Sequence, residues 1–422
     1  MPERAFISIP LDIREVRVLR TEINAANEFV LTVESTRKSA TCRICGRSIT
    51  ERHGSDEVRT LRHLPILGRP VFLRLRPKRL RCTSCDGQPT TTQQLDWYDP
   101  NGLHTKAFEQ QLIVGLVNST ITDLVAKEDV SYDALLGILD RWVAKTVDWD
   151  ALDSFSTLGI DEIALTKGHR NFVAVISART DSGYLQLLTV LPDRLKTTLV
   201  AWLTSIPVAV REHITTVCTD MWEGYVTAVQ EVLPKATIVI DRFHVARHYR
   251  DSVDTLRKQE IKRLRAGLPE EQKANLKRTL WPMRKRPEDR TIDEQAQLDR
   301  LLAHSPALQT ALRLREELTV IFETARSKLD GLRRIRFWCK RVIKSGLTCF
   351  DSFLALLDTW GDLIANYFID HQTSGFVEGL NNKLKVLKRR CYGLRNVGRL
   401  FQRLTLDLEG YRRFNPWYAE TY

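Results

Sequence analysis

The chain has 422 residues, of which 43% are hydrophobic and 27% charged, so it can hold two or three domains with full cores. Its first residues, MPERAFISIPLDI, lack the charged-then-apolar pattern of a signal peptide, and no apolar run reaches the roughly 18 residues of a membrane helix. We therefore expect a cytoplasmic protein and exclude a membrane-spanning one.

The net charge of +12 is unevenly distributed. Residues 381–422 carry ten Lys/Arg against three Asp/Glu, residues 251–290 carry twelve against seven, and residues 42–86 carry eleven against four. Such patches favour polyanions, because neutralised phosphates release their counterions. Nucleic acid is the partner that we favour, although anionic lipid or plain solubility would also account for the charge.

Four of the eight cysteines form two CxxC pairs in the first ninety residues, namely Cys42, Cys45, Cys82 and Cys85. Thiolates at this spacing can reach one ion, which predicts a structural zinc site. The gap between the pairs is longer than is usual in a zinc ribbon, so two unrelated knuckles or a redox pair remain alternatives.

Between the CxxC pairs, RPVFLRLRPKRLRC alternates apolar and other residues with the period of a half-buried strand. The alternation predicts that Val71, Leu73 and Leu75 face a core. The opposite face is basic, so the arm either lies on DNA or only holds itself together. The candidate DNA contacts are Arg74, Arg76, Lys78 and Arg79.

The segment from Thr105 to Val147 has a helical pattern. It predicts a short helix around 121–127, a break near Asp129, and a second helix capped by Ser131. This arrangement matches a helix-turn-helix, whose second helix can enter a major groove. Many helical hairpins look alike, so the prediction depends on its place after the cysteine arm.

Three short apolar runs each end in an aspartate: STLGIDEIAL at Asp161, HITTVCTD at Asp220 and ATIVID at Asp241. Two further strands are predicted in NFVAVISAR and YLQLLTVL, with helices in RLKTTLVAWLTSI and WEGYVTAVQEVL, which indicates an α/β fold with a mixed sheet. Each aspartate could simply start a turn. Three in succession favour a divalent cation, since converging carboxylates otherwise repel one another.

The stretch TSGFVEGLNNKLKVLKRRCYG predicts a helix with an apolar stripe of Val377, Leu380, Leu384 and Leu387. A second face carries Glu378, Asn382, Lys385 and Arg389. Two interpretations fit a single acid at the head of so basic a helix. It is either a surface ion-pair helix, or Glu378 is a metal ligand beside a phosphate backbone.

The chain resembles the DDE transposases of bacterial insertion sequences, specifically the ISL-three family. The likeness runs over nearly the whole length, through the CxxC arm, the helix-turn-helix, GIDE, TDMWEGY, DRFHV and GFVEGLNNKLKVLKRRCYGLRN. It implies an α/β, RNase H-like catalytic core at 151–422. The 157 residues between Asp220 and Glu378 exceed what a minimal core needs, so we expect a helical insertion at about 250–365. Before the core, it implies a zinc-ribbon-like arm at 1–98 and a helix-turn-helix domain at 99–150.

The resemblance also implies the chemistry. Asp161, Asp220 and Glu378 would be the catalytic triad and would hold two magnesium or manganese ions for DNA cleavage and strand transfer. Asp241 and His244 would lie beside the metal ligands, although Asp241 could itself be the third carboxylate and His244 could pair with His248 on a metal. In the helix that carries Glu378, the residues expected to contact DNA phosphates are Asn382, Lys385, Lys388, Arg389 and Arg390.

The expected DNA is the terminal inverted repeats of the element together with the target, bound by a homodimer or higher assembly near the bacterial nucleoid. Two alternatives are a DNA-binding regulator without catalysis and a structure-selective nuclease. The insertion either handles DNA ends or is an inert support. We expect Trp222, Trp281, Trp338 and Trp360 to pack in cores or between helices; one of them could stack on an unpaired base, but the sequence does not select which.

Overall fold

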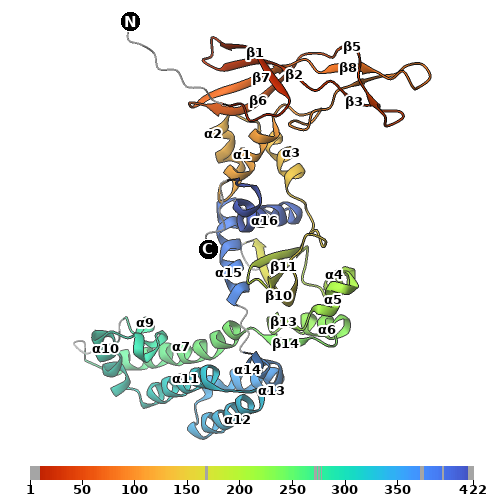
Figure 1. Ribbon diagram of the computed structural model, residues 1–422. Helices are drawn as coiled ribbons and strands as arrows, with labels where there is room; N and C mark the ends of the chain where they lie inside the picture. Colours follow the sequence, from red (N-terminus) through yellow and green to blue (C-terminus); the bar gives the residue numbers. More distant parts are fainter. Residues whose placement is uncertain are drawn as a thin grey trace. The chain divides into compact units, whose positions relative to one another are not determined.

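The computed structural model describes residues 10–166, 170–269, 273, 276, 278–370, 375–391 and 394–416, with the backbone alone at 166, 170, 171, 370, 375–378 and 381. The chain divides into two compact units, Met1–Val143 with Glu409–Tyr422, and Ala144–Leu408 (Figure 1). Within the described ranges, no helix is long and apolar enough to cross a membrane.

The first unit begins with three small sheets (Figure 1). The largest has the order β1-β2-β7-β6, with β2 and β7 parallel and the other neighbours antiparallel. Its strands are β1 (Val16–Ile23), β2 (Phe29–Ser35), β6 (Arg59–Ile66) and β7 (Arg69–Leu75). The smaller sheets pair β3 (Ala40–Thr41) with β4 (Ser48–Ile49), and join β5 (Glu51–Ser55), β8 (Lys78–Arg81) and β9 (Thr90–Thr92).

The predicted alternation along β7 is confirmed. Val71, Leu73 and Leu75 are fully buried, while Arg74 points to solvent. Their core partners come from neighbouring strands and from the segment after β9, and include Leu31, Val33, Leu61, Leu95 and Tyr98.

Three helices follow: α1 (Lys106–Leu116), α2 (Ile121–Glu128) and α3 (Tyr132–Trp142). Thr105, Thr120 and Ser131 cap them, each hydroxyl accepting from a backbone N–H three residues on. Asp129 ends α2 in the left-handed conformation, at a φ of 51°. The helix pair and the break predicted near Asp129 are therefore present.

The second unit is built on a five-stranded sheet of order β12-β11-β10-β13-β14 (Figure 1). β10 (Phe155–Thr166), β11 (Arg170–Thr180) and β12 (Leu185–Leu191) are antiparallel, whereas β10, β13 (Thr216–Thr219) and β14 (Thr237–Ile240) run parallel. The predicted mixed sheet is confirmed. α4 (Lys196–Ser205) and α5 (Val208–His213) lie between β12 and β13, and α6 (Glu223–Val232) lies between β13 and β14.

Helices cover both faces of this sheet. On one face, Leu158 and Ile160 of β10 belong to a core that includes Leu199, Val229 and Val245, from α4, α6 and α7 (Arg242–Gly267). On the other, Ile163 and Leu165 pack with α15 (Gly375–Arg390) and α16 (Val397–Phe414). The unit is thus a three-layer α/β/α arrangement.

A helical segment separates β14 from α15. It comprises α7 (Arg242–Gly267), α9 (Leu280–Arg284), η2 (Pro287–Asp289), α10 (Ile292–Ala303), α11 (Pro306–Thr324), α12 (Lys328–Ser345), η3 (Thr348–Phe350), α13 (Asp351–Ala365) and α14 (Tyr367–Asp370). Asn366 Nδ2 donates to the carbonyl of Ile238 over 2.7 Å, which attaches the segment to β14. Trp338 is buried and donates to the Leu314 carbonyl over 2.7 Å.

Candidate active site and nucleic-acid interface

Three aspartates stand side by side at one end of the parallel strands. Ile160 pairs with Thr219, and Thr219 pairs with Ile240. The next residues along the three strands are Asp161, Asp220 and Asp241. Because neighbouring strands in register place equivalent residues together, these acids occupy adjacent positions at one edge of the sheet. Asp220 and Asp241 directly follow β13 and β14, as the sequence predicted. The prediction that the first strand ends at Asp161 is wrong, because β10 continues to Thr166 through its pairing with β11.

Each carboxylate is oriented by a backbone N–H close to it in the chain. Oδ1 of Asp161 accepts from Glu162, Oδ1 of Asp220 accepts from Met221, both over 2.6 Å, and Oδ1 of Asp241 accepts from Phe243 over 2.7 Å. The last bond also caps α7. Asp241 therefore has a structural task of its own at the start of that helix.

His244 lies in the first turn of α7 and contacts the second aspartate. Its Nδ1 is 2.8 Å from Oδ1 of Asp220. Burial alone would lower the pKa of His244, but the hydrogen bond and charge of Asp220, together with the charges of Asp241 and Asp161, raise that pKa to about 9. An imidazolium thus faces the three acids at neutral pH.

Tyr225 on α6 is fully buried beside the acids. Its hydroxyl has no hydrogen-bond partner among the described residues. Burial is the main cause that raises the pKa of this phenol, and the charges of Glu162, Asp161 and Asp220 add to it. An unsatisfied hydroxyl among converging carboxylates fits a site that receives a hydrated divalent cation, since a metal-bound water would satisfy it.

A cluster of three side chains lies next to the aspartates and consists of Glu162, Arg194 and Trp222. The guanidinium of Arg194 lies 3.2 Å from Oε2 of Glu162. Its central carbon lies 4.6 Å from the ring centroids of both Phe172 and Trp222. Sequence analysis missed Arg194, because no motif marks it; GIDE and TDMWEGY, however, contain Glu162, Trp222 and Tyr225.

The tryptophans do not all pack as expected. Trp338 is buried, but Trp222 remains 42% exposed and Trp281 67% exposed. The expectation of core packing is therefore wrong for Trp222 and Trp281. Both side chains instead have an arginine over the ring, Arg194 for Trp222 and Arg284 for Trp281.

The side chain of Glu378 lies outside the described residues, but its helix is placed. Leu380, Leu384 and Leu387 are buried against β10, β11, β12 and α16, as the apolar stripe predicted; Val377 lies outside the described side chains. Residues two apart on a strand share a face, so Asp161 projects to the same face as Ile163 and Leu165. α15 therefore covers the face toward which Asp161 projects.

The basic residues of α15 divide into two groups. Asn382, Lys385 and Arg389 are exposed, as expected of DNA contacts. Lys388 instead donates to the carbonyl of Ala164 on β10, and Arg390 pairs with the buried carboxylate of Asp407 over 3.1 Å. These two side chains hold α15 in place. Of the five residues expected to contact DNA phosphates, Lys388 and Arg390 are thus engaged within the protein.

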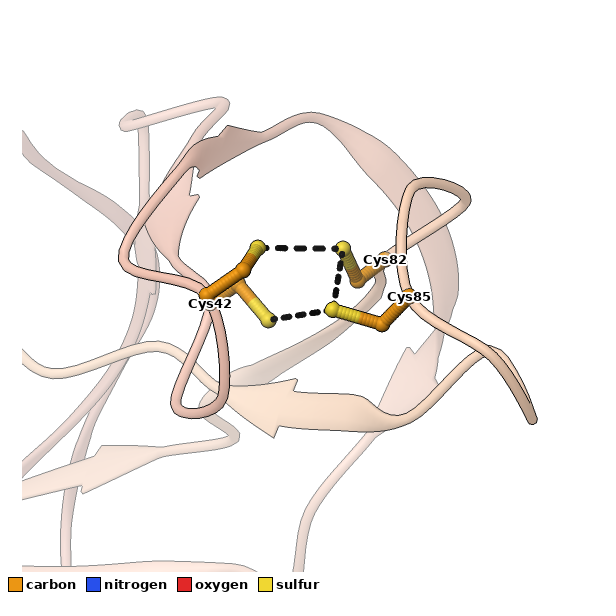
Figure 2. A group of neighbouring side chains, drawn as sticks. Cys42, Cys82 and Cys85 are labelled. Carbon is orange, nitrogen blue, oxygen red and sulfur yellow. Dashed lines mark hydrogen bonds between the residues drawn. The ribbon is translucent and has the colours of Figure 1, made fainter.

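The four predicted zinc ligands come together in the first unit (Figure 2). Their sulfurs all lie within 4.8 Å of one another, with Cys42–Cys85 at 4.0 Å, Cys45–Cys82 at 3.8 Å and Cys82–Cys85 at 3.6 Å. A tetrahedral ion with bonds of about 2.3 Å needs sulfurs about 3.8 Å apart. The cluster therefore fits zinc.

Backbone N–H groups prepare one of these thiols for metal. Those of Cys45 and Ile44 lower the pKa of Cys42 to about 6, so its sulfur is a thiolate at neutral pH. The other sulfurs raise the pKa of Cys85 to about 12. Repulsion of this kind is relieved when a cation enters the cluster.

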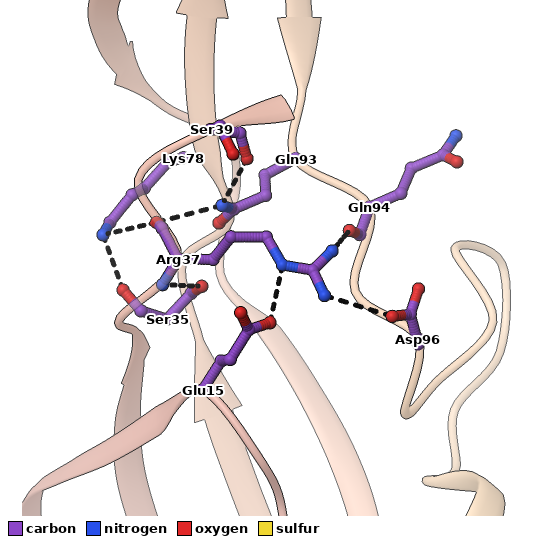
Figure 3. A network of polar contacts seen from close by, with 8 residues as sticks. All are labelled: Glu15, Ser35, Arg37, Ser39, Lys78, Gln93, Gln94 and Asp96. Atoms are coloured by element: carbon purple, nitrogen blue, oxygen red, sulfur yellow. Dashed lines mark hydrogen bonds and ion pairs between the residues drawn. The ribbon is translucent and has the colours of Figure 1, made fainter. Parts of the chain in front are cut away.

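A polar network joins the cysteine-bearing sheets to the rest of the arm (Figure 3). Arg37 contacts Glu15 over 2.6 Å and Asp96 over 3.1 Å. Lys78 Nζ donates to the carbonyls of Ser35 and Arg37. Of the predicted arm contacts, Arg74, Arg76 and Arg79 are exposed, whereas Lys78 is engaged within this network.

Comparison with known proteins identifies the family of this chain. The family model DDE_Tnp_ISL3, described as "Transposase", matches residues 158–404. The transposase for insertion sequence element IS1001 of Bordetella parapertussis is 26% identical, with 90% of this chain and 92% of the relative covered. The transposase for IS1557 of Mycobacterium tuberculosis H37Rv is 25% identical, with 89% and 87% covered.

Among solved structures, a chain of the Drosophila P element transposase strand transfer complex matches 72% of this chain and 91% of its own length, with 13% identity and a TM-score of 0.41. The family match alone covers more than half of the sequence. The chain therefore belongs to the ISL3 family of DDE transposases and is a DNA transposase by class.

Proposed function

We propose that this transposase binds the terminal inverted repeats of its own insertion sequence and catalyses their metal-dependent cleavage and strand transfer. The observation that carries the proposal is the adjacent placement of Asp161 and Asp220, with α15 covering the face toward which Asp161 projects. The strand order, three antiparallel strands followed by two parallel ones, supports an RNase H-like core.

Asp161, Asp220 and Glu378 are the proposed metal ligands, and Asp241 and His244 support them. Two magnesium or manganese ions held there would supply an activated nucleophile and stabilise the departing 3′ oxygen. His244 holds the carboxylate of Asp220 in place from the side of α7. Asp241 fixes the start of that helix, which is why we assign it a supporting role.

The DNA-binding surface that we propose has two parts. Asn382, Lys385 and Arg389 lie exposed on the helix that carries Glu378, so they would hold phosphates next to the acids. In the first unit, a zinc-stabilised arm with Arg74, Arg76 and Arg79, followed by the α2–α3 helix-turn-helix, would bind the terminal repeat. Joining two ends in one reaction requires two copies, so we propose a homodimer or higher assembly.

The test incubates the full chain with a labelled terminal repeat, a target plasmid and magnesium. We expect cleavage and joined products, abolished in Asp161→Asn, Asp220→Asn and Glu378→Gln with DNA binding retained. Asp251→Asn, which changes an exposed acid on α7, is the matched control and should react normally. Binding without cleavage under any divalent metal would instead support a regulator, and cleavage without joining a nuclease.

A further inference from the structure

We infer that Trp222 is a stacking platform for one unpaired base of the DNA, at a nucleotide next to the phosphate being cut. This inference rests on the proposed function, because it places the base relative to the acids that would act on that phosphate. It selects one of the four tryptophans that the sequence could not distinguish.

The backbone holds Trp222 close to the catalytic edge. It follows Asp220 by two residues, and its N–H donates to the Asp220 carbonyl over 2.8 Å. Its own carbonyl accepts from Tyr225 and Val226, at 3.0 and 3.2 Å, in the first turn of α6. Two residues span at most about 7.6 Å, and nucleotides rise about 3.4 Å each along a strand. The Cα of Trp222 therefore lies within about two nucleotide steps of the Cα of Asp220.

The position of the indole is set by its neighbours. Arg194 covers one face of the ring, and the same guanidinium stacks on Phe172, at 4.6 Å from each centroid. Gly224 leaves room along the indole edge, since a Cβ there would lie 2.8 Å from Trp222 Nε1. Three elements, β11, the loop before α4 and the start of α6, thus fix the ring before any DNA binds.

Of the side chains around Trp222, the indole itself is the group that remains available to bind DNA. Both carboxylate oxygens of Glu162 lie within 3.4 Å of Arg194 Nη1, so this guanidinium is already paired and is not a free phosphate ligand. The aromatic surface that the cluster exposes is the indole, at 42%, next to the Arg194 side chain, which is 37% exposed. An indole face stacks on any base, but a base within a duplex is covered by its neighbours on both sides. The partner must therefore be a base that has left the stack.

The core tryptophan of the same unit provides a contrast. Trp338 is 1% exposed and its Nε1 donates to a backbone carbonyl, as packing residues do. Trp281 is exposed on α9 with its own arginine, Arg284, at 5.8 Å from the ring centroid. Trp281 is therefore a matched control: an exposed indole with a cation over it, in the helical segment and not beside the acids.

The experiment crosses protein variants with DNA variants. Full-length wild type, Trp222→Ala, Trp222→Phe and Trp281→Ala are assayed on end DNA that is intact or abasic at each of the two nucleotides on either side of the cut. On intact DNA, Trp222→Ala should lower the single-turnover cleavage rate or the affinity by about tenfold. On the DNA that lacks the stacked base, it should equal wild type. Trp222→Phe should retain most activity, and Trp281→Ala should show no such coupling.

A second readout needs no cleavage. Permanganate attacks an accessible face of a thymine ring, so it oxidises thymines that have left the duplex stack. A thymine with one face on the indole keeps its other face free and should react in the wild-type complex. In the Trp222→Ala complex the same thymine should stay within the duplex and be protected. If Trp222→Ala lowered the cleavage rate or affinity equally on intact and abasic DNA, or left the permanganate pattern unchanged, Trp222 would not be a stacking platform. Failure of the proposed function has another signature, because wild type would then bind the end and leave every substrate uncut.

Discussion

His244 Nδ1 lies 2.8 Å from Asp220 Oδ1, so the first turn of α7 contacts the acid that ends β13. This contact joins α7 to the part of the sheet where Asp161, Asp220 and Asp241 lie side by side. Groups that orient metal ligands typically affect metal affinity or activity by about 10- to 100-fold.

We therefore expect His244→Ala to reduce cleavage by about 10- to 100-fold and to change the magnesium concentration at half-maximal rate. His213→Ala, which removes an exposed histidine on α5, is the control and should change neither. A magnesium titration of single-turnover cleavage measures both effects. Equal behaviour of the two variants would remove His244 from the site.

Gly224→Ala should disturb Trp222 without unfolding α6. The added Cβ would lie 2.8 Å from the indole Nε1, and the indole can move aside. We expect a change in stability below about 1 kcal/mol, because alanine also favours the helix. Cleavage of intact DNA should fall in the same direction as for Trp222→Ala, and a cleavage assay with thermal unfolding checks both.

The cysteine cluster predicts one zinc per chain. Cys42→Ser or Cys82→Ser should remove the metal and lower the unfolding temperature of the first unit, because binding free energy contributes to its folding. Cys349→Ser is the control, since that cysteine lies in the second unit and outside the cluster. Elemental analysis of purified protein with thermal unfolding measures the outcome, and wild type without zinc would contradict the prediction.

Gly331→Ala should be costly, because its Cβ would lie 2.1 Å from Phe368, a fully buried ring on α14. Overpacking of this kind costs about 1–3 kcal/mol. Gly361→Ala on α13 is the control: no atom lies within 4 Å of its added Cβ, so it should stabilise by up to about 1 kcal/mol. Denaturant unfolding of the two variants should therefore shift in opposite directions.

The first unit should lose stability in mild acid. Burial lowers the pKa of His63 below its ordinary 6.5, and a hydrogen bond with the backbone of Leu11 opposes this shift only in part. Burial lowers the pKa of His104 as well. The folded unit therefore keeps these rings neutral, whereas the unfolded chain takes up protons below about pH 6.5. Stability is complete above that pH and falls as the pH drops toward the folded pKa.

His63→Gln tests this dependence, since its amide can still contact Thr105 Oγ1, which lies 2.9 Å from His63 Nδ1 in the wild type. The variant should unfold with a weaker dependence on pH between 7.5 and about 5.5. Identical slopes for the variant and wild type would show that His63 contributes nothing.

Helices and strands were predictable from the sequence where the spacing of their apolar residues matches the side chains that the structure buries. The period-2 residues of β7, the capping residue Ser131 and the stripe Leu380, Leu384 and Leu387 all lie as expected. Asp220 and Asp241 directly follow their strands as predicted, whereas β10 continues past Asp161 to Thr166 because it pairs with β11.

Contacts between distant side chains were not predictable. Lys388 and Arg390 carry the same charge as Lys385, and only the tertiary structure turns them toward Ala164 and Asp407. Arg194 has no motif around it, because its partners Phe172 and Trp222 come from two other elements. Sequence periodicity describes one element at a time, so it could not reveal such a contact.

α7 runs for 26 residues without interruption, starting from the cap at Asp241. At 1.5 Å per residue it is a stiff rod about 39 Å long. Its first turn contacts Asp220 through His244. A displacement of the far end of a stiff helix is transmitted to its first turn. A ligand that displaced the outer end of α7 would therefore also shift His244 relative to Asp220.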